Sequence, residues 1–401
     1  MNNTKVKRIG IDARMYGPIA KGLGRYIQEI VDNILKIDEF NEYVVFLKKE
    51  NFEEFQTDNP RVRKVIADVG WYTIVEQIKM PYYYWRERLD LVHIPHFNVP
   101  VFILNKFVVT IHDLILIRYP TARASTLGPI LYKIKNFAYR FSIKLAVKRA
   151  TKIIAVSNFT KKDIVDLFQI DEKKVEVTLE GVANLQKNRE NLFIKDRDDK
   201  KTLLGYNIGA NYLLYVGNAY PHKNLEGLLD VFANIKKKNS EKYHNLQLVL
   251  VGKSDYFYER TKEHAQFLGL WEENKENNNV VFPGFVDDTE LEILYQQAIA
   301  YVFPSFYEGF GLPPLEAMTK GCPVISSNAT SMPEILGEAA KYFNPKNKDE
   351  IKIVIENVLG NNELLQQMSI KGKEQSKKYS WWECARETHE IYNSILKSKL
   401  N

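Results

Sequence analysis

Residues 304–318 read Pro-Ser-Phe-Tyr-Glu-Gly-Phe-Gly-Leu-Pro-Pro-Leu-Glu-Ala-Met, and this stretch decides the fold of the chain. The apolar run that precedes it, Ile299–Phe303, is typical of a buried strand. A glycine-rich turn follows, and a helical pattern begins at Leu315 and ends near Gly321. The stretch therefore predicts a strand, a tight turn and a helix N-terminus, whose free N–H groups and dipole attract phosphate.

Carboxylates stand on both sides of this turn. Glu308 precedes the glycines, and Glu316 lies inside the helix that follows. Each can hold hydroxyl groups on one side of a bound phosphate. A nucleotide sugar has this order of groups, with ribose hydroxyls, a diphosphate and sugar hydroxyls. The alternative interpretation is an ordinary helix N-terminus with solvated acids.

Length and composition indicate a multidomain protein with real cores. The chain has 401 residues, 45% of them hydrophobic, which suggests two or three domains. Its cysteines, Cys322 and Cys384, are far apart, which argues against a disulfide framework. The polar start of the chain lacks an apolar signal core, and no run is long enough to span a bilayer. We expect a cytoplasmic protein that can touch a membrane as a peripheral protein.

Short strands rich in Val and Ile alternate with helical patterns in both halves of the chain. This alternation predicts an α/β protein with two doubly wound, Rossmann-like parallel-sheet domains that face a central cleft. We expect the first domain at residues 1–190, a charged linker at 191–204 and the second domain at 205–381. A final helix, 382–401, is expected to pack back on the first domain.

Several motifs suggest other chemistry, but the sequence around each of them argues against it. Gly252-Lys253-Ser254 follows a strand, but the first glycine of a P-loop would fall at Gln247. No G-x-G-x-x-G follows the first strand of either half, which argues against a dinucleotide oxidoreductase. Asp196 and Asp198 form a D-x-D in the charged linker, where a solvated charge run is the favoured interpretation. The histidines show no paired metal spacing, so no metal and no other cofactor is expected.

The residues after Met318 extend the pattern with a second glycine break, Gly321-Cys322-Pro323, then a strand, and then a helix that starts at Pro333. Together these residues resemble the retaining glycosyltransferases of family 4, the group 1 transferases with a GT-B fold. The signature of that family, E-G-F-G-L-P-x-L-E-A-M, stands intact from Glu308 to Met318. The resemblance implies an enzyme that moves a hexose from a nucleoside-diphosphate sugar to a glycan or a lipid-diphosphate acceptor.

The second half carries most of the donor site that the resemblance implies. Lys223 matches the lysine of the family's P-x-K-N run, which contacts the donor diphosphate. This lysine stands at the start of a helix, against the dipole preference, so an anion is expected beside it. Glu316 should hold the ribose diol and Glu308 the sugar hydroxyls. Further donor contacts are implied in the two turns and near the base, at Asn218, Val286, Gly309, Phe310, Gly311 and Leu312. Asn218 replaces the arginine that many members carry, so one fixed positive charge is missing.

Candidate residues in the first half follow predicted strands. His112 ends an apolar strand in an H-D-L context, where the family has a histidine that contacts the transferred sugar and the donor phosphate. Gly22 is expected to allow a turn, and Gly24 is expected to let backbone approach phosphates or the acceptor. Ser157 is either a helix N-cap or a ligand contact. The catalytic set is thus His112, Lys223 and Glu308.

The resemblance also implies the stereochemistry. With Glu308 and Glu316 both holding hydroxyls, neither is placed to act as a nucleophile, so same-face transfer with retention is expected. The leaving phosphate would help to deprotonate the acceptor. GDP-mannose, or a related hexose donor, for cell-surface polysaccharide is the favoured substrate. Two alternatives are another GT-B chemistry, such as a phosphorylase or a nucleotide-sugar epimerase, and a noncatalytic sugar-binding protein.

A basic and aromatic segment spans residues 118–150 and contains no Asp or Glu. Its pattern suits an anionic membrane surface or a lipid-diphosphate acceptor, and a solvated helix face is the alternative. Nucleic acid is not an expected partner, because no recognition module is present. The basic residues are Arg118, Arg123, Lys133, Lys135, Arg140, Lys144, Lys148 and Arg149.

Overall fold

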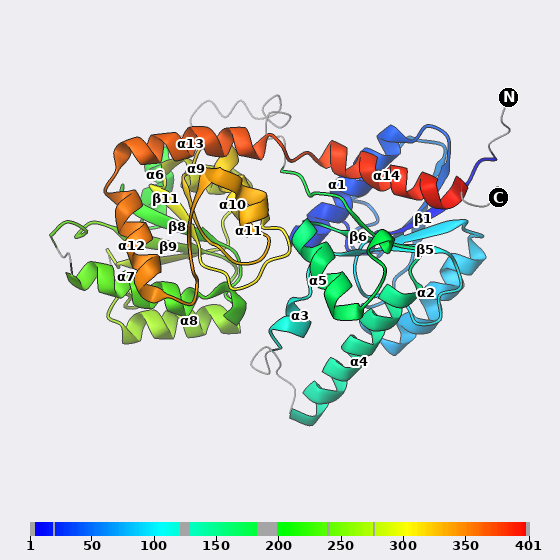
Figure 1. Ribbon diagram of the computed structural model, residues 1–401, viewed down its shortest axis with the longest axis horizontal. Coiled ribbons are helices and arrows are strands. Elements are labelled where there is room, and N and C mark those ends of the chain that lie inside the picture. The colour runs from blue at the N-terminus through cyan, green and yellow to red at the C-terminus, as the bar shows by residue number, and fades with distance from the viewer. Residues whose placement is uncertain are drawn as a thin grey trace. The chain divides into compact units, whose positions relative to one another are not determined.

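The structure is a computed structural model that describes residues 5–18, 21–120, 129–182, 199–238, 241–275 and 277–397 (Figure 1). Side chains are described for these residues except at positions 21 and 129–135. The chain divides into two compact units. Unit 1 is Met1–Gly181 with Ser380–Asn401, and unit 2 is Val182–Tyr379.

Unit 1 is built on a seven-stranded parallel sheet with the order β3-β2-β1-β4-β5-β6-β7. The strand order reverses between β1 and β4, so the carboxyl ends of these two strands flank a topological switch point. Apolar side chains fill both faces, as the near-continuous Val and Ile runs predict. The strands are β1 (Arg8–Asp12), β2 (Glu42–Leu47), β3 (Val62–Ile66), β4 (Leu91–Ile94), β5 (Phe107–Ile111), β6 (Lys152–Ala155) and β7 (Val175–Val177).

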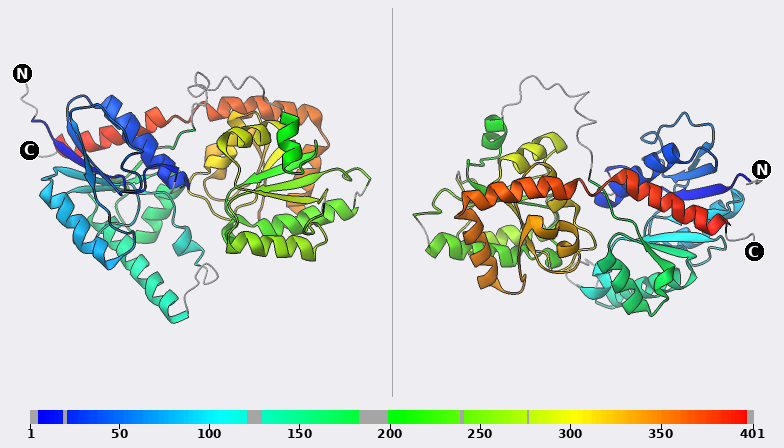
Figure 2. Two further views of the ribbon diagram at one scale, coloured as in Figure 1. Left: turned by 180° about the vertical axis from the view of Figure 1, so that it is seen from behind. Right: turned by 45° about the horizontal axis from the view of Figure 1, so that its top comes forward.

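Helices cover both faces of this sheet (Figures 1 and 2). Side chains of α2 (Ile74–Arg86), α4 (Pro129–Arg149) and α5 (Asn158–Phe168) join one core cluster with strand residues. Helices α1 (Lys21–Ile37) and α14 (Trp381–Lys397) pack against each other. The short α3 (Ile115–Arg118) follows β5.

Polar contacts tie the C-terminal helix α14 into unit 1. His389 Nε2 lies 3.0 Å from Asp38 Oδ2 at the end of α1, and the Tyr392 hydroxyl is hydrogen-bonded to Nδ1 of buried His93. Burial and the charge of nearby His112 lower the pKa of His93 to about 3, and they outweigh the opposing effect of Asp12. His93 is therefore neutral and serves the packing of α14.

Unit 2 repeats this architecture on a six-stranded parallel sheet with the order β10-β9-β8-β11-β12-β13. Its switch point lies between β8 and β11. The strands are β8 (Tyr212–Val216), β9 (Gln247–Val251), β10 (Val280–Gly284), β11 (Ala300–Phe303), β12 (Val324–Ser327) and β13 (Ala340–Phe343). The helices are α6 (Asp199–Gly205), α7 (Leu225–Lys238), α8 (Tyr256–Phe267), α9 (Asp288–Gln297), α10 (Leu312–Thr319), α11 (Met332–Leu336), α12 (Lys348–Leu359) and α13 (Asn362–Ser376).

The two parallel sheets confirm the predicted α/β, doubly wound fold, with local corrections. Residues 199–204, predicted as linker, form most of α6, because this segment packs on α9 and Asp199 accepts a hydrogen bond from Gln297 at 2.9 Å. The N-cap of α9 is Asp287, which accepts hydrogen bonds from two backbone N–H groups. Asp196 and Asp198 lie outside the described residues. In the described parts of the chain, no helix is long and apolar enough to cross a membrane.

Candidate active site

An ion pair between Lys223 and Glu308 lies at the switch point of unit 2. Lys223 ends a short 3-10 turn (η5, Pro221–Lys223) that follows β8, and Glu308 lies in the turn that follows β11. The Lys223 Nζ is 2.6 Å from Glu308 Oε1, and the two side chains are only 12% and 9% exposed. The same ammonium lies 5.4 Å from the centre of the Phe303 ring. The anion expected beside Lys223 is therefore Glu308.

Hydrogen bonds hold the turn that carries Glu308 from both sides. The Glu308 N–H donates to Thr330 Oγ1 at 3.0 Å, and the Ser331 hydroxyl donates to the Glu308 carbonyl at 3.1 Å. On the β8 side, the Phe306 N–H donates to the His222 carbonyl, and Asn224 Nδ2 donates to the Pro304 carbonyl. This clamp fixes the Glu308 backbone before any ligand binds.

Backbone strain accompanies the clamp. Thr330 has a φ of 58°, which is unusual for a β-branched residue. Gly311, the N-cap of α10, has a φ of 101°, and a Cβ there would stand 2.4 Å from Met332 Cε. Such strain persists only where the surroundings over-determine the conformation, and it clusters at functional sites. Position 311 therefore requires glycine, both because its φ is positive and because a Cβ would collide with Met332.

Glu316 lies on α10, one turn inside the helix, and its carbonyl accepts a hydrogen bond from the Thr319 hydroxyl. Burial raises the pKa of the Tyr301 phenol well above its usual range, and the charges of Glu308 and Glu316 add to this effect. Both carboxylates are therefore close enough to Tyr301, in β11, to raise the pKa of its phenol. The structure brings Lys223, Glu308 and Glu316 to the same edge of the sheet.

Buried tyrosine hydroxyls position the turn after β8, which contains Asn218. Tyr215 donates to the Asn218 carbonyl at 2.7 Å, Tyr258 to the Gly217 carbonyl at 2.8 Å and Tyr301 to the Val216 carbonyl at 3.1 Å. Three side chains thus hold three successive carbonyls. The turn enters the site as a pre-formed element, which favours ligand binding by reducing the ordering that binding requires.

The other donor-side candidates lie in the loops around this edge. Val286 is buried in the turn between β10 and α9, and Phe310 is buried with its ring 5.6 Å from that of Tyr379. Gly309 and Leu312 flank Phe310 and Gly311, and Leu312 is the first residue of α10.

His112 follows β5 in unit 1, and both its ring nitrogens face acceptors. Nδ1 lies 2.9 Å from Glu180 Oε1, and Nε2 lies 3.1 Å from the Pro95 carbonyl oxygen. Burial opposes the imidazolium, but the Glu180 hydrogen bond and charge and the Pro95 carbonyl outweigh it and raise the pKa of His112. Each ring nitrogen therefore donates a hydrogen bond to an acceptor within unit 1. A ligand that accepts a hydrogen bond from this ring must displace Glu180 or the Pro95 carbonyl.

The remaining candidates of unit 1 lie in a helix or at its N-cap. Gly22 and Gly24 both lie in α1, and in the described part of the preceding loop Gly17 has a positive φ, of 92°. The expectation that Gly22 allows a turn is therefore wrong. Ser157 is fully buried and accepts from the Thr160 N–H at 3.1 Å as the N-cap of α5, which supports the structural interpretation of this serine.

Family comparisons decide what kind of protein carries this site. The model of "Glycosyl transferases group 1" matches residues 196–375, and that of "Glycosyltransferase Family 4" matches residues 20–183. The chain belongs to the group 1 glycosyltransferases.

Relatives of this glycosyltransferase match from two thirds to nearly the whole of its length. "O-antigen chain mannosyltransferase B" of Escherichia coli is 26% identical over 389 residues, which are 93% of this chain and 96% of that protein. "O-antigen chain mannosyltransferase RfbU" of Salmonella typhimurium is 31% identical over 268 residues, 67% of this chain and 64% of that protein. Sucrose-phosphate synthase of Thermosynechococcus elongatus shares the fold, with a TM-score of 0.72, 19% identity and coverage of 98% of this chain and 100% of that one. The fold of the enzyme is thus GT-B.

Sequence reasoning missed several residues that hold the site of this glycosyltransferase. Thr330 and Ser331 lie in the short turn between β12 and α11, a position where hydroxyl side chains commonly bond to backbone. Glu180 is buried three residues after β7, and an acid so close to an apolar strand was an available signal. In the described residues, no group of three or more His, Cys, Asp or Glu could hold a metal ion.

Proposed function

We propose that the enzyme transfers mannose from a nucleoside-diphosphate donor, with GDP-mannose favoured, to a growing surface polysaccharide, with retention of configuration. The buried Lys223–Glu308 ion pair at the switch point carries this proposal. Both mannosyltransferase relatives described above are named for O-antigen chains, which supports the choice of sugar and product class.

The ion pair supplies the two groups that a donor needs. A diphosphate would take Lys223 as its counter-ion, because phosphate carries more charge than one carboxylate. Glu308 would then be released to accept hydrogen bonds from sugar hydroxyls. Binding would exchange one buried charge contact for another, so no charge is left buried without a partner.

The reaction follows from these contacts. The bond between the sugar C1 and the leaving phosphate oxygen breaks, while a bond forms between C1 and an acceptor oxygen on the same face. The acceptor proton passes to the leaving phosphate. Lys223 and the positive dipole end of α10 stabilise the negative charge that develops on the diphosphate. His112 is proposed, by family resemblance, to contact the transferred sugar.

The Glu316→Gln variant tests the donor site. If Glu316 accepts hydrogen bonds from the ribose hydroxyls, the variant should bind GDP more weakly by about 1.5–3 kcal/mol, the range for hydrogen bonds to a charged group. Isothermal titration of GDP into parent and variant measures this loss. Equal affinities would remove Glu316 from the donor site.

We also propose that transfer requires no metal and no other cofactor. Lys223 and the helix N-terminus would supply the positive potential that a metal supplies elsewhere. Transfer of radiolabelled mannose should therefore continue at the parent rate in excess EDTA. Loss of activity that magnesium or manganese restores would contradict the proposal, and would direct attention to Asp196 and Asp198.

The basic segment is proposed to dock on an anionic membrane, with a smaller set of residues than its composition suggests. Arg118 is paired with Asp163, and Arg149 donates to the carbonyls of Val101 and Ile103, so both arginines are used within the fold. An exposed row remains along one face of α4, with the spacing of successive helical turns. The row consists of Phe137, Phe141, Lys144 and Lys148. Arg123 lies outside the described residues, as do the side chains of Lys133 and Lys135.

A second exposed apolar row lies on α2 in the same unit, and it strengthens the membrane proposal. Its large side chains are each more than half exposed, although soluble surfaces rarely gather such groups on one face. Exposed Lys79 and Arg86 stand on the same helix, and the acids Glu76 and Glu87 beside them are buried. The row is Ile74, Ile78, Tyr82 and Trp85.

Vesicle co-sedimentation tests this surface. Each exposed lysine near an anionic membrane contributes about 1 kcal/mol, screened by salt. Changing Lys144 and Lys148 to Gln should reduce sedimentation with phosphatidylglycerol vesicles at low salt. The matched control changes Lys237 and Lys238 of α7, which are exposed on unit 2. Equal sedimentation of both variants and the parent would contradict docking through α4.

A further inference from the structure

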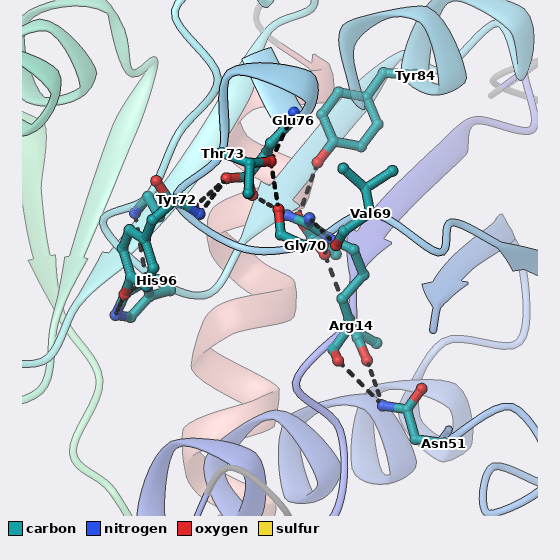
Figure 3. Close-up of polar contacts among 12 residues, drawn as sticks. Arg14, Asn51, Val69, Gly70, Tyr72, Thr73, Glu76, Tyr84 and His96 are labelled. Atoms are coloured by element: carbon teal, nitrogen blue, oxygen red, sulfur yellow. Dashed lines mark hydrogen bonds and ion pairs between the residues drawn. The ribbon is translucent and has the colours of Figure 1, made fainter. Parts of the chain in front are cut away.

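A buried charge network occupies the switch point of unit 1, between the ends of β1 and β4 (Figure 3). The Arg14 guanidinium is bonded to Asp12 at 2.8 Å and to Glu76 at 2.6 Å, and the three side chains are at most 6% exposed. Tyr84 also donates to Asp12, at 3.0 Å. Desolvating such a set offsets much of its Coulomb energy, so it is weak evidence for a role in stability.

The network fixes two loops at the carboxyl edge of the sheet. The second oxygen of Glu76 accepts from the Tyr72 N–H at 2.7 Å and from Asn98 Nδ2 at 2.8 Å. Asn98 in turn donates its N–H to His96 Nδ1 at 3.4 Å. The loop before α2 and the loop after β4 are therefore both tied to one buried carboxylate.

Tyr72 is both strained and exposed at the end of this network. Its φ is 60°, a conformation that costs an L-residue free energy and that glycine adopts without strain. Its side chain is 60% exposed and lies beside His96 in Figure 3. The N–H bond to Glu76 and ring contacts with His96 and Phe97 hold this conformation, while more than half of the Tyr72 side chain stays open to a ligand. A strained residue held by a buried network points to contact with a ligand.

The neighbours of Tyr72 complete an aromatic surface. The Tyr72 ring centre lies 6.0 Å from that of His96 and 6.2 Å from that of Phe97. Burial and the nearby charge of His112 lower the pKa of His96 to about 3, so the imidazole is neutral. The surface thus combines apolar ring faces with a hydroxyl and a neutral imidazole at its rim. A pyranose ring offers the matching chemistry, with C–H groups on its faces and hydroxyls at its edge.

We propose that Tyr72, His96 and Phe97 form the subsite that binds a sugar ring of the acceptor, with Glu76 as the positioning residue. The inference rests on the proposed glycosyl transfer and names where unit 1 takes its saccharide substrate. His112 is hydrogen-bonded to Pro95, the residue before His96. The subsite therefore adjoins, within unit 1, the histidine assigned to the transferred sugar.

Tyr72→Gly tests the subsite, because glycine relieves the positive φ while the ring is lost. The probe is a methyl α-mannotrioside, which has no lipid, with GDP-mannose as donor. The acceptor KM should rise by about fivefold or more, since an aromatic contact is worth that much. The donor KM and the acceptor-free hydrolysis of GDP-mannose should stay unchanged, and the thermal midpoint should not fall. The control, Phe267→Ala, removes an aromatic side chain at the end of α8 that is 84% exposed and lies in unit 2.

Other outcomes would overturn the subsite. An unchanged acceptor KM in Tyr72→Gly would do so, as would a higher donor KM, which would mean that the nucleotide stacks there. A lower thermal midpoint with both KM values raised would assign Tyr72 a structural role. If the parent transfers nothing, the proposed function fails, and saturation-transfer NMR of the trimannoside with parent and Tyr72→Gly still decides the subsite: equal signals overturn it.

Discussion

Replacing Lys223 with methionine should slow mannosyl transfer by roughly 100- to 1000-fold, the usual loss when one group that stabilises developing charge is removed. Methionine keeps much of the length of the side chain and removes the charge. The diphosphate would then leave without the ammonium that lies 2.6 Å from Glu308. Steady-state kcat with GDP-mannose measures the effect.

The control for this variant is Lys253→Met, which removes an exposed lysine from the loop after β9. Its rate should match that of the parent. Lys223→Met also leaves Glu308 buried without its partner, which should destabilise the protein by about 3 kcal/mol or more in urea unfolding. The double variant with Glu308→Gln should recover part of this stability but none of the activity. A parent-like rate in Lys223→Met would contradict the assigned role.

Replacing Glu308 with glutamine should lower the transfer rate by about 10- to 100-fold, because hydrogen bonds from sugar hydroxyls to a charged acceptor would be lost. GDP should bind this variant at least as tightly as it binds the parent, since Lys223 would no longer be engaged by a carboxylate. The combination of slower transfer with undiminished nucleotide affinity distinguishes Glu308 from a diphosphate-binding residue. Transfer kinetics and calorimetry of GDP binding measure the two effects.

Glu308→Asp is the matched comparison, because it keeps the charge and shortens the side chain. The shorter carboxylate would lie farther from the Lys223 ammonium but would still attract it. GDP affinity should therefore increase less in Glu308→Asp than in Glu308→Gln. If Glu308→Gln instead binds GDP much more weakly than the parent, the proposal that Lys223 leaves Glu308 to pair with the diphosphate is wrong.

The order of elements could be predicted because the periodicity is local. The strands of unit 2, such as Tyr212–Val216 and Gln247–Val251, are short runs rich in apolar residues, the pattern from which the sequence predicts a parallel sheet. The pairing of Lys223 with Glu308 could not be derived in the same way. It depends on β8 and β11 being neighbours while β9 and β10, which lie between them in sequence, stand on the other side of β8.

The strained backbone positions and the buried charge pairs could not be predicted from the sequence either. Gly311 could be recognised as the residue that the turn requires, but Thr330 and Tyr72 have positive φ angles without a glycine or asparagine to signal them. Arg14 and Glu76 are separated by 62 positions, and only tertiary packing makes them partners. The roles assigned to the site residues from resemblance stay predictions until the variants are measured.

The most direct test of the account is a transfer assay with the full chain, GDP-mannose and a methyl α-mannotrioside, in which the product is analysed by mass spectrometry and NMR. We predict a product longer by one mannose, with the new anomeric centre in the α configuration of the donor, and no product from UDP-glucose or dTDP-glucose. A β-linked product would contradict retention. Absence of any product, with GDP-mannose left intact, would contradict the proposed mannosyl transfer itself.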